Sequence, residues 1–215
     1  MDPSKKIKVK RAPQRGFYDK ETIYSILDSD FVCQVAFVHE NYPVIIPTIY
    51  GRKENVIYIH GATVSRMLVD LETGIPISIN VTHTKGIVLA RSAFNHSLNY
   101  ESVTIFGTAV LVESEEERME ALKIISDQVL QDRWDEIRLP NEKEMKATKV
   151  LKIEISEASA KIRTGPPKDE KADYDLPVWA GVIPINTTLG TPLPDPDLKE
   201  GIELPKSVKK LFEND

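Results

Sequence analysis

The sequence predicts a mainly β fold with helices, an antiparallel barrel decorated by helices. Short apolar segments rich in β-branched and aromatic residues fill most of residues 31–112, and most of them are joined by turns. The strongest helical periodicity comes later, from Ser114 onward. A doubly wound parallel sheet would alternate strands with helices along the whole chain, so these observations favour the antiparallel arrangement.

Composition limits the class of protein further. The chain has 215 residues, enough for one domain of ordinary size, with 41% hydrophobic and 28% charged residues, as in soluble globular proteins. Its net charge of −5 argues against extensive contact with nucleic acid. A single cysteine, Cys33, excludes an internal disulfide and a thiolate zinc site, so no metal site is expected.

Neither a membrane span nor an export signal is expected. No apolar run approaches the roughly 18–20 residues needed to cross a bilayer. The amino terminus continues into lysines, whereas a secretory signal would continue into an apolar segment. We therefore expect a cytoplasmic protein.

Three regions differ in composition. Residues 1–17 are a basic arm, residues 18–184 hold the apolar periodic segments, and residues 185–215 are a tail rich in proline and charge. The arm is either solvated or in contact with phosphate on a partner or on a second subunit. The tail is expected to lie extended on a surface.

Four helices are expected. Asp19 is placed to cap a short helix that carries Ile23, Ile26 and Leu27 on one face. A second helix is expected over 64–72, closed by Gly74, and a short one over 141–148. The longest begins at the capping box Ser114–Glu117 and directs one apolar stripe toward the sheet: Met119, Leu122, Ile125 and Val129.

The strands are expected where the apolar period changes from helical to extended. The segment 31–38 has too many apolar positions for one of its faces to be exposed to solvent, and the turn at 40–43 suggests that it forms a hairpin with the next strand. The expected strands are 31–38, 44–50, 56–60, 75–81, 87–90, 102–112 and 150–163.

The segment 58–67 is the first candidate for chemistry. A strand ends near His60, Gly61 lets the chain turn, and a helix follows, with Ser65 and Arg66 at its start. Free N–H groups, a hydroxyl and a guanidinium are the mixture that a phosphate monoester needs. The alternative is a capping turn whose Arg66 reaches solvent.

The segment 86–100 is the second. Arg91 lies in an apolar stretch, so burying it would be costly unless it is paired or holds a ligand. Beside it are polar side chains without metal-ligand spacing, namely His96, Asn99 and Tyr100. The alternative is a buried Arg91–Glu101 pair with a satisfied His96.

Two weaker candidates follow. Lys161 and Arg163 are two residues apart on an expected strand, so they form a positive patch on one face, which an ordinary solvent-exposed face explains equally well. Trp179 lies in an apolar stretch of a polar region and is either a packing anchor or a ligand-stacking ring. No Ser–His–Asp arrangement supports hydrolysis.

In this order, the segments resemble the flavin-nucleotide-binding branch of the pyridoxamine 5′-phosphate oxidase-like family, which includes proteins linked to nitroimidazole resistance. The resemblance covers roughly residues 18–184. The matching strings are YIHGA (58–62), SRM (65–67), VLARSAF (88–94), HS (96–97), NY (99–100), SV (102–103), FG (106–107), ASAKIR (158–163), GPP (165–167) and WAG (179–181).

The resemblance implies a split β-barrel that binds FMN, usually between the two subunits of a homodimer. The segment with His60, Gly61, Ser65 and Arg66 would lie at the flavin phosphate and ribityl chain. The remaining implied site residues are Pro47, Thr48 and Tyr50 along the ring, Arg91 and Ser92 near the ring or phosphate, His96, Asn99 and Tyr100 on the substrate side, Lys161 and Arg163 from the partner subunit, and Trp179 at the cleft wall. Relatives commonly carry a basic residue where this chain has Glu101, which puts the substrate preference in doubt.

Physical reasoning agrees with a flavin monophosphate, because a pyrophosphate cofactor would call for a glycine fingerprint that the sequence lacks. The leading hypothesis is an FMN-dependent oxidoreductase that takes electrons from a reduced nicotinamide or another small donor. The alternative is a non-catalytic carrier or sensor that holds flavin, or haem through His60 or His96. Nucleic-acid binding would rest on the basic arm alone.

Overall fold

The protein, described here by a computed structural model covering residues 4–213, is built on one antiparallel sheet that closes into a ring. The expected mainly antiparallel β fold with helices is confirmed. The strands follow the order β1-β8-β6-β7-β4-β3-β2-β5-β9, and an additional pairing of β5 with β6 closes the ring through β6, β7, β4, β3, β2 and β5. Their bounds are β1 (Gly16–Phe17), β2 (Val32–His39), β3 (Tyr42–Lys53), β4 (Val56–Ala62), β5 (Pro76–Leu89), β6 (Ser97–Leu111), β7 (Thr148–Glu154), β8 (Glu157–Arg163) and β9 (Gly181–Pro184).

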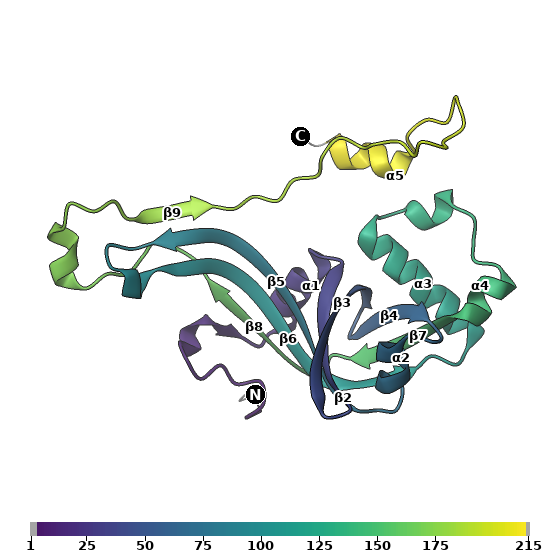
Figure 1. The fold of residues 1–215 in the computed structure, drawn as a ribbon, viewed down its shortest axis with the longest axis horizontal. Coiled ribbons are helices and arrows are strands. Elements are labelled where there is room, and N and C mark those ends of the chain that lie inside the picture. Colours follow the sequence, from purple (N-terminus) through teal and green to yellow (C-terminus); the bar gives the residue numbers. More distant parts are fainter. Residues whose placement is uncertain (1–3, 214–215) are drawn as a thin grey trace.

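Residues 4–213 form five α-helices, and all but the last pack against strands of the sheet (Figure 1). They are α1 (Lys20–Asp28), α2 (Arg66–Leu71), α3 (Glu115–Val129), α4 (Glu142–Ala147) and α5 (Lys206–Lys209), with 3-10 turns η1 (Pro13–Arg15), η2 (Ala93–Asn95), η3 (Arg133–Glu136), η4 (Lys171–Asp175) and η5 (Lys210–Phe212). Asp19 caps α1 as expected, because its carboxylate accepts from Thr22 N at 2.8 Å. Within the described residues, no helix is apolar and long enough to cross a membrane.

The core fills the ring with aliphatic side chains from its strands and from α1 and α2. Tyr50 is fully buried there, and its hydroxyl donates to the carbonyl of Leu27, which ties β3 to the end of α1. Helix α3 packs on β3, where Ile125 is buried against Gly51. Gly51 is required at this position because a Cβ there would lie 2.7 Å from the Cα and N of Ile125.

Several expected strand boundaries were wrong. The segment 150–163 is two strands, β7 and β8, because β7 pairs with β4 and β6 while β8 pairs with β1 and with β6. Conversely, 75–81 and 87–90 belong to the single strand β5, whose register shifts between Thr84 and Gly86. Contrary to expectation, strand β2 has an outward face, with Val38 57% exposed, because no other element of residues 4–213 covers it.

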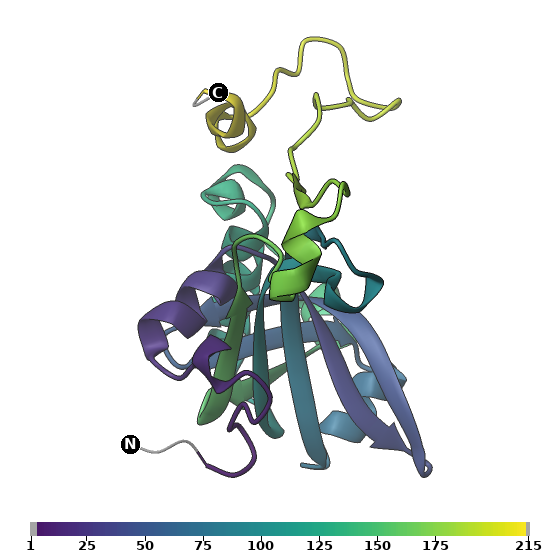
Figure 2. The same cartoon turned by 90° about the vertical axis from the view of Figure 1, so that its left-hand side faces the viewer.

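The hairpin of β5 and β6 extends beyond the ring, and residues 164–184 fold back along it; we call residues 84–99 with 164–184 the arm (Figure 1). Strand β9 pairs with β5 at the arm, from Gly86↔Pro184 to Leu89↔Gly181. The chain then crosses clear of the ring to α5 in both views (Figures 1 and 2). There Ser207 N donates to Glu136 Oε1 of η3 at 3.1 Å, so the C-terminal segment is anchored and not wholly extended.

Candidate functional site

A cleft of about 480 Å³ lies between the ring and helix α3. Its floor is formed by β3 and β4: Tyr50 pairs with Ile59, so Ile49 and His60 are neighbours on adjacent strands. Its far wall comes from α3 and η3. The lining residues are Ile49, His60, Leu122, Ile125, Ser126, Val129, Leu130, Arg133, Trp134 and Pro140, most of them apolar.

His60 is the titratable group of this cleft that burial perturbs. Its Nδ1 is buried and has no hydrogen-bond partner among the described residues. Burial lowers the pKa of His60 below the ordinary 6.5, so the imidazole is neutral at pH 7. A neutral imidazole in apolar surroundings is a free Lewis base, which is the form in which histidine binds a metal centre. Elsewhere, residues 4–213 contain no group of three His, Cys, Asp or Glu side chains arranged to hold a metal ion.

The turn between β4 and α2 has the expected local geometry. Ser65 is the N-cap of α2 in extended conformation, but its side chain makes no capping hydrogen bond. Arg66 is exposed and forms no ion pair with any carboxylate of residues 4–213. On β3, Thr48 and Pro47 lie opposite Cys33 and Gln34 of β2. Tyr50, which was expected to lie along the flavin ring, lies in the core of the protein with no exposed surface.

Arg91 is paired, but not with Glu101 as the alternative interpretation had it. Its guanidinium lies 3.1 Å from the carboxylate of Asp169, its backbone N donates to the same carboxylate at 3.0 Å, and it stacks over the ring of Tyr174. These contacts hold residues 164–184 onto the hairpin of β5 and β6. Glu101 instead lies 3.6 Å from Lys85, which stands at the register shift of the facing strand β5. Ser92, which follows Arg91, caps η2 without a side-chain bond.

The other expected residues of this region have separate places. His96 is exposed, with Nε2 3.2 Å from the carbonyl of Ala90. Asn99 is buried and accepts a hydrogen bond from Arg163, while Tyr100 is the strand neighbour of Arg163. Lys161 lies on β8 opposite Gly16. Trp179 is 66% exposed, with its ring packed over Gly181.

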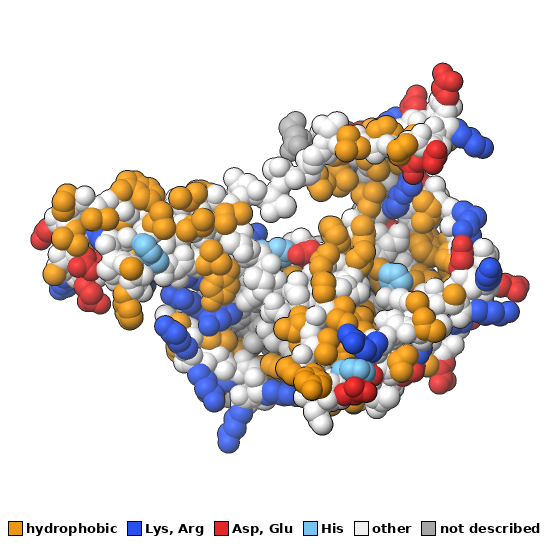
Figure 3. Space-filling model, viewed as in Figure 1, with side chains coloured by type: hydrophobic (Ala, Val, Ile, Leu, Met, Phe, Trp, Pro, Cys, Tyr) orange, Lys and Arg blue, Asp and Glu red, His pale blue; other side chains and the backbone are white. Residues whose placement is uncertain are grey.

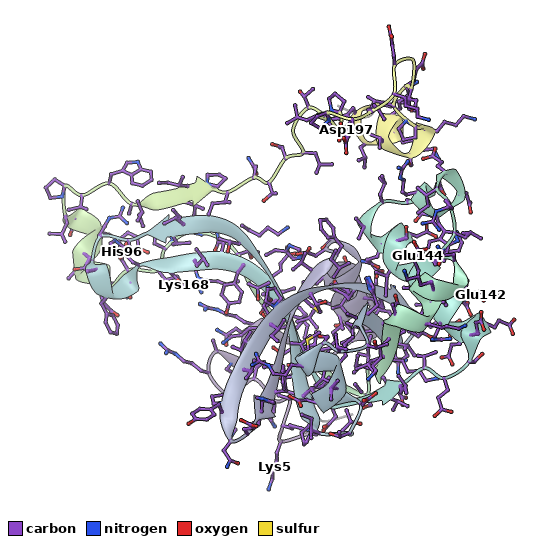
Figure 4. All side chains as sticks on the ribbon, turned by 45° about the vertical axis from the view of Figure 1, so that its right-hand side comes forward. Lys5, His96, Glu142, Glu144, Lys168 and Asp197 are labelled. Carbon is purple, nitrogen blue, oxygen red and sulfur yellow. The ribbon has the colours of Figure 1, made fainter. Side chains whose placement is uncertain are left out.

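Within one chain, the expected site residues do not form a single cleft. Arg66 begins α2 beside the ring, whereas His96 lies at the far end of the arm (Figures 1 and 4). No pattern in the sequence pointed to Arg133 and Trp134 as neighbours of His60, because they are more than 70 residues away along the chain and belong to no recognisable motif.

Comparison with known proteins supports a family assignment. Residues 19–162 match the family model described as pyridoxamine 5′-phosphate oxidase. The chain is 36% identical to the flavocytochrome Anf3 from Azotobacter vinelandii, with a TM-score of 0.92 and 97% of each chain covered. It is 34% identical to the FAD and haem binding protein from Mycobacterium smegmatis, with a TM-score of 0.88, covering 92% of this chain and 97% of that one.

A candidate 5-nitroimidazole antibiotic resistance protein from Bacteroides thetaiotaomicron shares the fold. Its sequence identity is 21% and the TM-score is 0.57, over 68% of this chain and 86% of that one. No curated protein matches the chain. The family model spans most of the sequence, and two relatives above 30% identity match nearly all of it. The chain therefore belongs to the pyridoxamine 5′-phosphate oxidase-like family of flavin-binding proteins.

Proposed function

We propose that this protein is a redox protein that binds a flavin and a haem, and that His60 is the protein ligand of the haem iron. The half-buried imidazole of His60 carries the proposal, because it lines an apolar cleft and its buried Nδ1 has no hydrogen-bond partner among the described residues. The names of the two relatives above, a flavocytochrome and an FAD and haem binding protein, support it. Of the two histidines that the sequence left open for haem, the geometry favours His60.

The residues of the cleft fit a haem. A porphyrin needs apolar contact on its faces and a base for its iron, and its propionates need a cation or solvent. The aliphatic side chains of α3 with Trp134 and Pro140 would provide the apolar contact. Arg133 lies at the same cleft and would face a propionate. The cleft volume of about 480 Å³ lies within the roughly 300–1,000 Å³ usual for ligand pockets.

The protein's own part in the chemistry is to bind, orient and exclude water. When bound, haem and flavin together would supply one-electron and two-electron exchange. His60 would be held as a base by its burial, which keeps a proton off the imidazole at neutral pH. The apolar wall of α3 would limit access of water and lower the local dielectric, which tunes a redox potential. Reduction by a nicotinamide or another small donor belongs to the same proposal.

We place the flavin, expected from the sequence to be FMN, at the segment around Ser65 and Arg66, together with Thr48 on β3. Arg66 has no carboxylate partner among residues 4–213, so its charge is available to a phosphate. The Mycobacterium smegmatis relative is named for FAD, so the identity of the nucleotide is part of the test.

The proposal includes a homodimer. The arm carries exposed apolar side chains that a monomer would leave in water, among them Phe94 at 94% and Trp179 at 66% exposed. Figure 3 shows such side chains gathered on the arm. A patch of this kind marks an interface, and a second copy would bring an arm with Arg91 and Ser92 toward the Arg66 region, from which they are separated within one chain. Mass measurement in solution would return twice 24.2 kDa, whereas a monomer would contradict this part.

The absorption spectrum of the purified protein tests the haem ligand. We expect a flavin spectrum and a Soret band in the wild type, loss of the Soret band in His60→Ala, and both features kept in the matched control His96→Ala. A Soret band that survives in His60→Ala would overturn the assignment of the ligand.

The flavin is tested separately. Release of the cofactor by denaturation, followed by chromatography, distinguishes FMN from FAD, and colourless protein that ignores both would end the proposal. Arg66→Ala is expected to weaken flavin binding by about 1.5–3 kcal/mol through loss of charge-assisted hydrogen bonds. Bleaching of the flavin by a nicotinamide donor would favour an oxidoreductase, while a bound flavin that no donor reduces would favour the carrier.

A further inference from the structure

A small pocket of about 240 Å³ lies where the N-terminal segment crosses the end of β8, away from the cleft of His60. Its lining combines cations with short neutral polar groups: Gln14, Arg15, Phe17, Ile162, Arg163, Thr164, Pro166 and Lys168. Figure 3 shows basic side chains gathered beneath the arm, and Figure 4 labels Lys168 there. We call this hollow the basic pocket.

The chain builds the basic pocket from two distant segments. Gly16 of β1 pairs with Lys161 of β8, which fixes the preceding Arg15 beside the end of β8. Gly165 adopts a φ of +89°, a turn that returns the chain and places Lys168 on the other side. Near the N-terminus, Lys6 and Ser4 bond to Glu157 at 2.7 and 2.8 Å, so the described part of the basic N-terminal segment is held at β8 and is not free in solvent.

The positive charge of the pocket is not neutralised by the protein. Arg15, Arg163 and Lys168 form no ion pair with any carboxylate of residues 4–213. Burial, and next the charge of Arg15, lowers the pKa of Arg163, which indicates that the two guanidinium groups repel each other. Like charges gathered in a hollow cost free energy unless an anion binds between them.

Arg163 is the fixed element of the pocket. It is only 7% exposed, and neutral acceptors orient it: the side chain of Asn99, the carbonyl of Gly165 at 3.3 Å and that of Pro166 at 3.4 Å. Its Nε is buried without a partner among the described residues. A guanidinium has five N–H donors, and these three bonds leave part of that capacity, and all of the charge, uncompensated.

We propose that the basic pocket binds the phosphate or diphosphate group of a nucleotide-type ligand. Three cations match a di- or trianion, and the amide of Gln14 and the hydroxyl of Thr164 are neutral donors of the kind that fix the direction of phosphoryl oxygens. The volume of about 240 Å³ is below the range of about 300–1,000 Å³ for whole-ligand pockets, so it suits the anionic group of a larger molecule. The proposal does not rest on the haem or on His60.

Titration of the purified, cofactor-loaded protein with inorganic pyrophosphate in a calorimeter tests the pocket. The variants Arg15→Gln and Lys168→Gln each remove one cation at its rim, and Lys171→Gln is the matched control because it removes a nearby charge that does not line the pocket. Arg163 is left intact, since it is buried and holds the turn at Gly165. We expect pyrophosphate to bind, and each rim variant to weaken it about tenfold or more while the control leaves it unchanged.

Two sources of the anion give different results. If pyrophosphate binds to the loaded protein, the pocket serves a separate phosphorylated ligand. If it does not, and Arg15→Gln and Lys168→Gln lose flavin about tenfold more readily than Lys171→Gln, the diphosphate of the flavin itself occupies the pocket. Absence of pyrophosphate binding together with equal flavin retention in all three variants would overturn the proposal. The Soret band would still test the assignment of His60 as haem ligand independently.

Discussion

Replacing Gly51 by alanine tests the close approach of β3 and α3 that forms the cleft of His60. The added Cβ would lie 2.7 Å from both Cα and N of Ile125 and 2.8 Å from the carbonyl carbon of Ile124. All three are backbone atoms of α3, so no side-chain rotation relieves the contact. Helix and strand would have to separate, which would shift the wall of the cleft relative to His60.

The cost follows from the depth of the overlap. Ordinary contact with a Cβ begins at 3.4 Å, so the 2.7 Å approach requires a displacement of about 0.7 Å across a well-packed interface. Overpacking of this kind costs about 1–3 kcal/mol, and we expect the upper half of that range because only backbone can yield. For a chain of this size, each kcal/mol lowers the melting temperature by about 2–4 °C.

Urea denaturation and thermal melting would measure the effect, with Gly107→Ala as the matched control. Gly107 also lies on a strand of the ring, but a Cβ there would meet Ile153 Cγ2 at 3.6 Å, which is ordinary contact. We expect Gly107→Ala to be close to neutral and Gly51→Ala to lose about 2–3 kcal/mol. If haem binds in the cleft as proposed, Gly51→Ala would also lower haem occupancy. Equal unfolding free energies for the two variants would refute the close packing of α3 on β3.

Three other perturbations have defined outcomes. Burial raises the pKa of the Cys33 thiol to about 12, so this thiol should not react with a disulfide reagent at pH 8 until the protein is unfolded; reaction at the rate of a free thiol would contradict its burial. The pKa of His60 is lowered in the folded state, so only the unfolded chain binds a proton as the pH falls below about 6.5, and the free energy of unfolding decreases there. His60→Asn should flatten this part of the plot of unfolding free energy against pH. An unchanged plot would place the histidine in solvent. Tyr50→Phe removes the bond to the Leu27 carbonyl, which still accepts from Gln128 Nε2 at 3.1 Å, so we expect a loss of only about 1 kcal/mol in urea denaturation, and a loss as large as that of a core cavity would show that this acceptor is left unsatisfied.

Local features were predictable from the sequence because short stretches of chain determine them. The N-cap at Asp19, the helix after Ser65, and the hairpin of β2 and β3 follow from residue types within a few positions of one another. The segments that resemble the family are likewise continuous strings, and they identified the fold and the flavin-binding class. Lys161 and Arg163 lie on one strand, as the sequence predicted.

Tertiary structure decided which distant groups meet. Glu101 is far nearer to Arg91 in the sequence, but Arg91 pairs with Asp169 because residues 164–184 fold back along the hairpin of β5 and β6. His60 and Trp134 line one cleft because α3 packs on Gly51 and η3 packs against α3. Arg15 meets Arg163 through the pairing of β1 with β8. Hydrophobic periodicity specifies the face that a segment buries but carries no information on the partner that covers it. Most strands and helices were therefore predictable from the sequence, whereas both candidate sites depend on long-range packing.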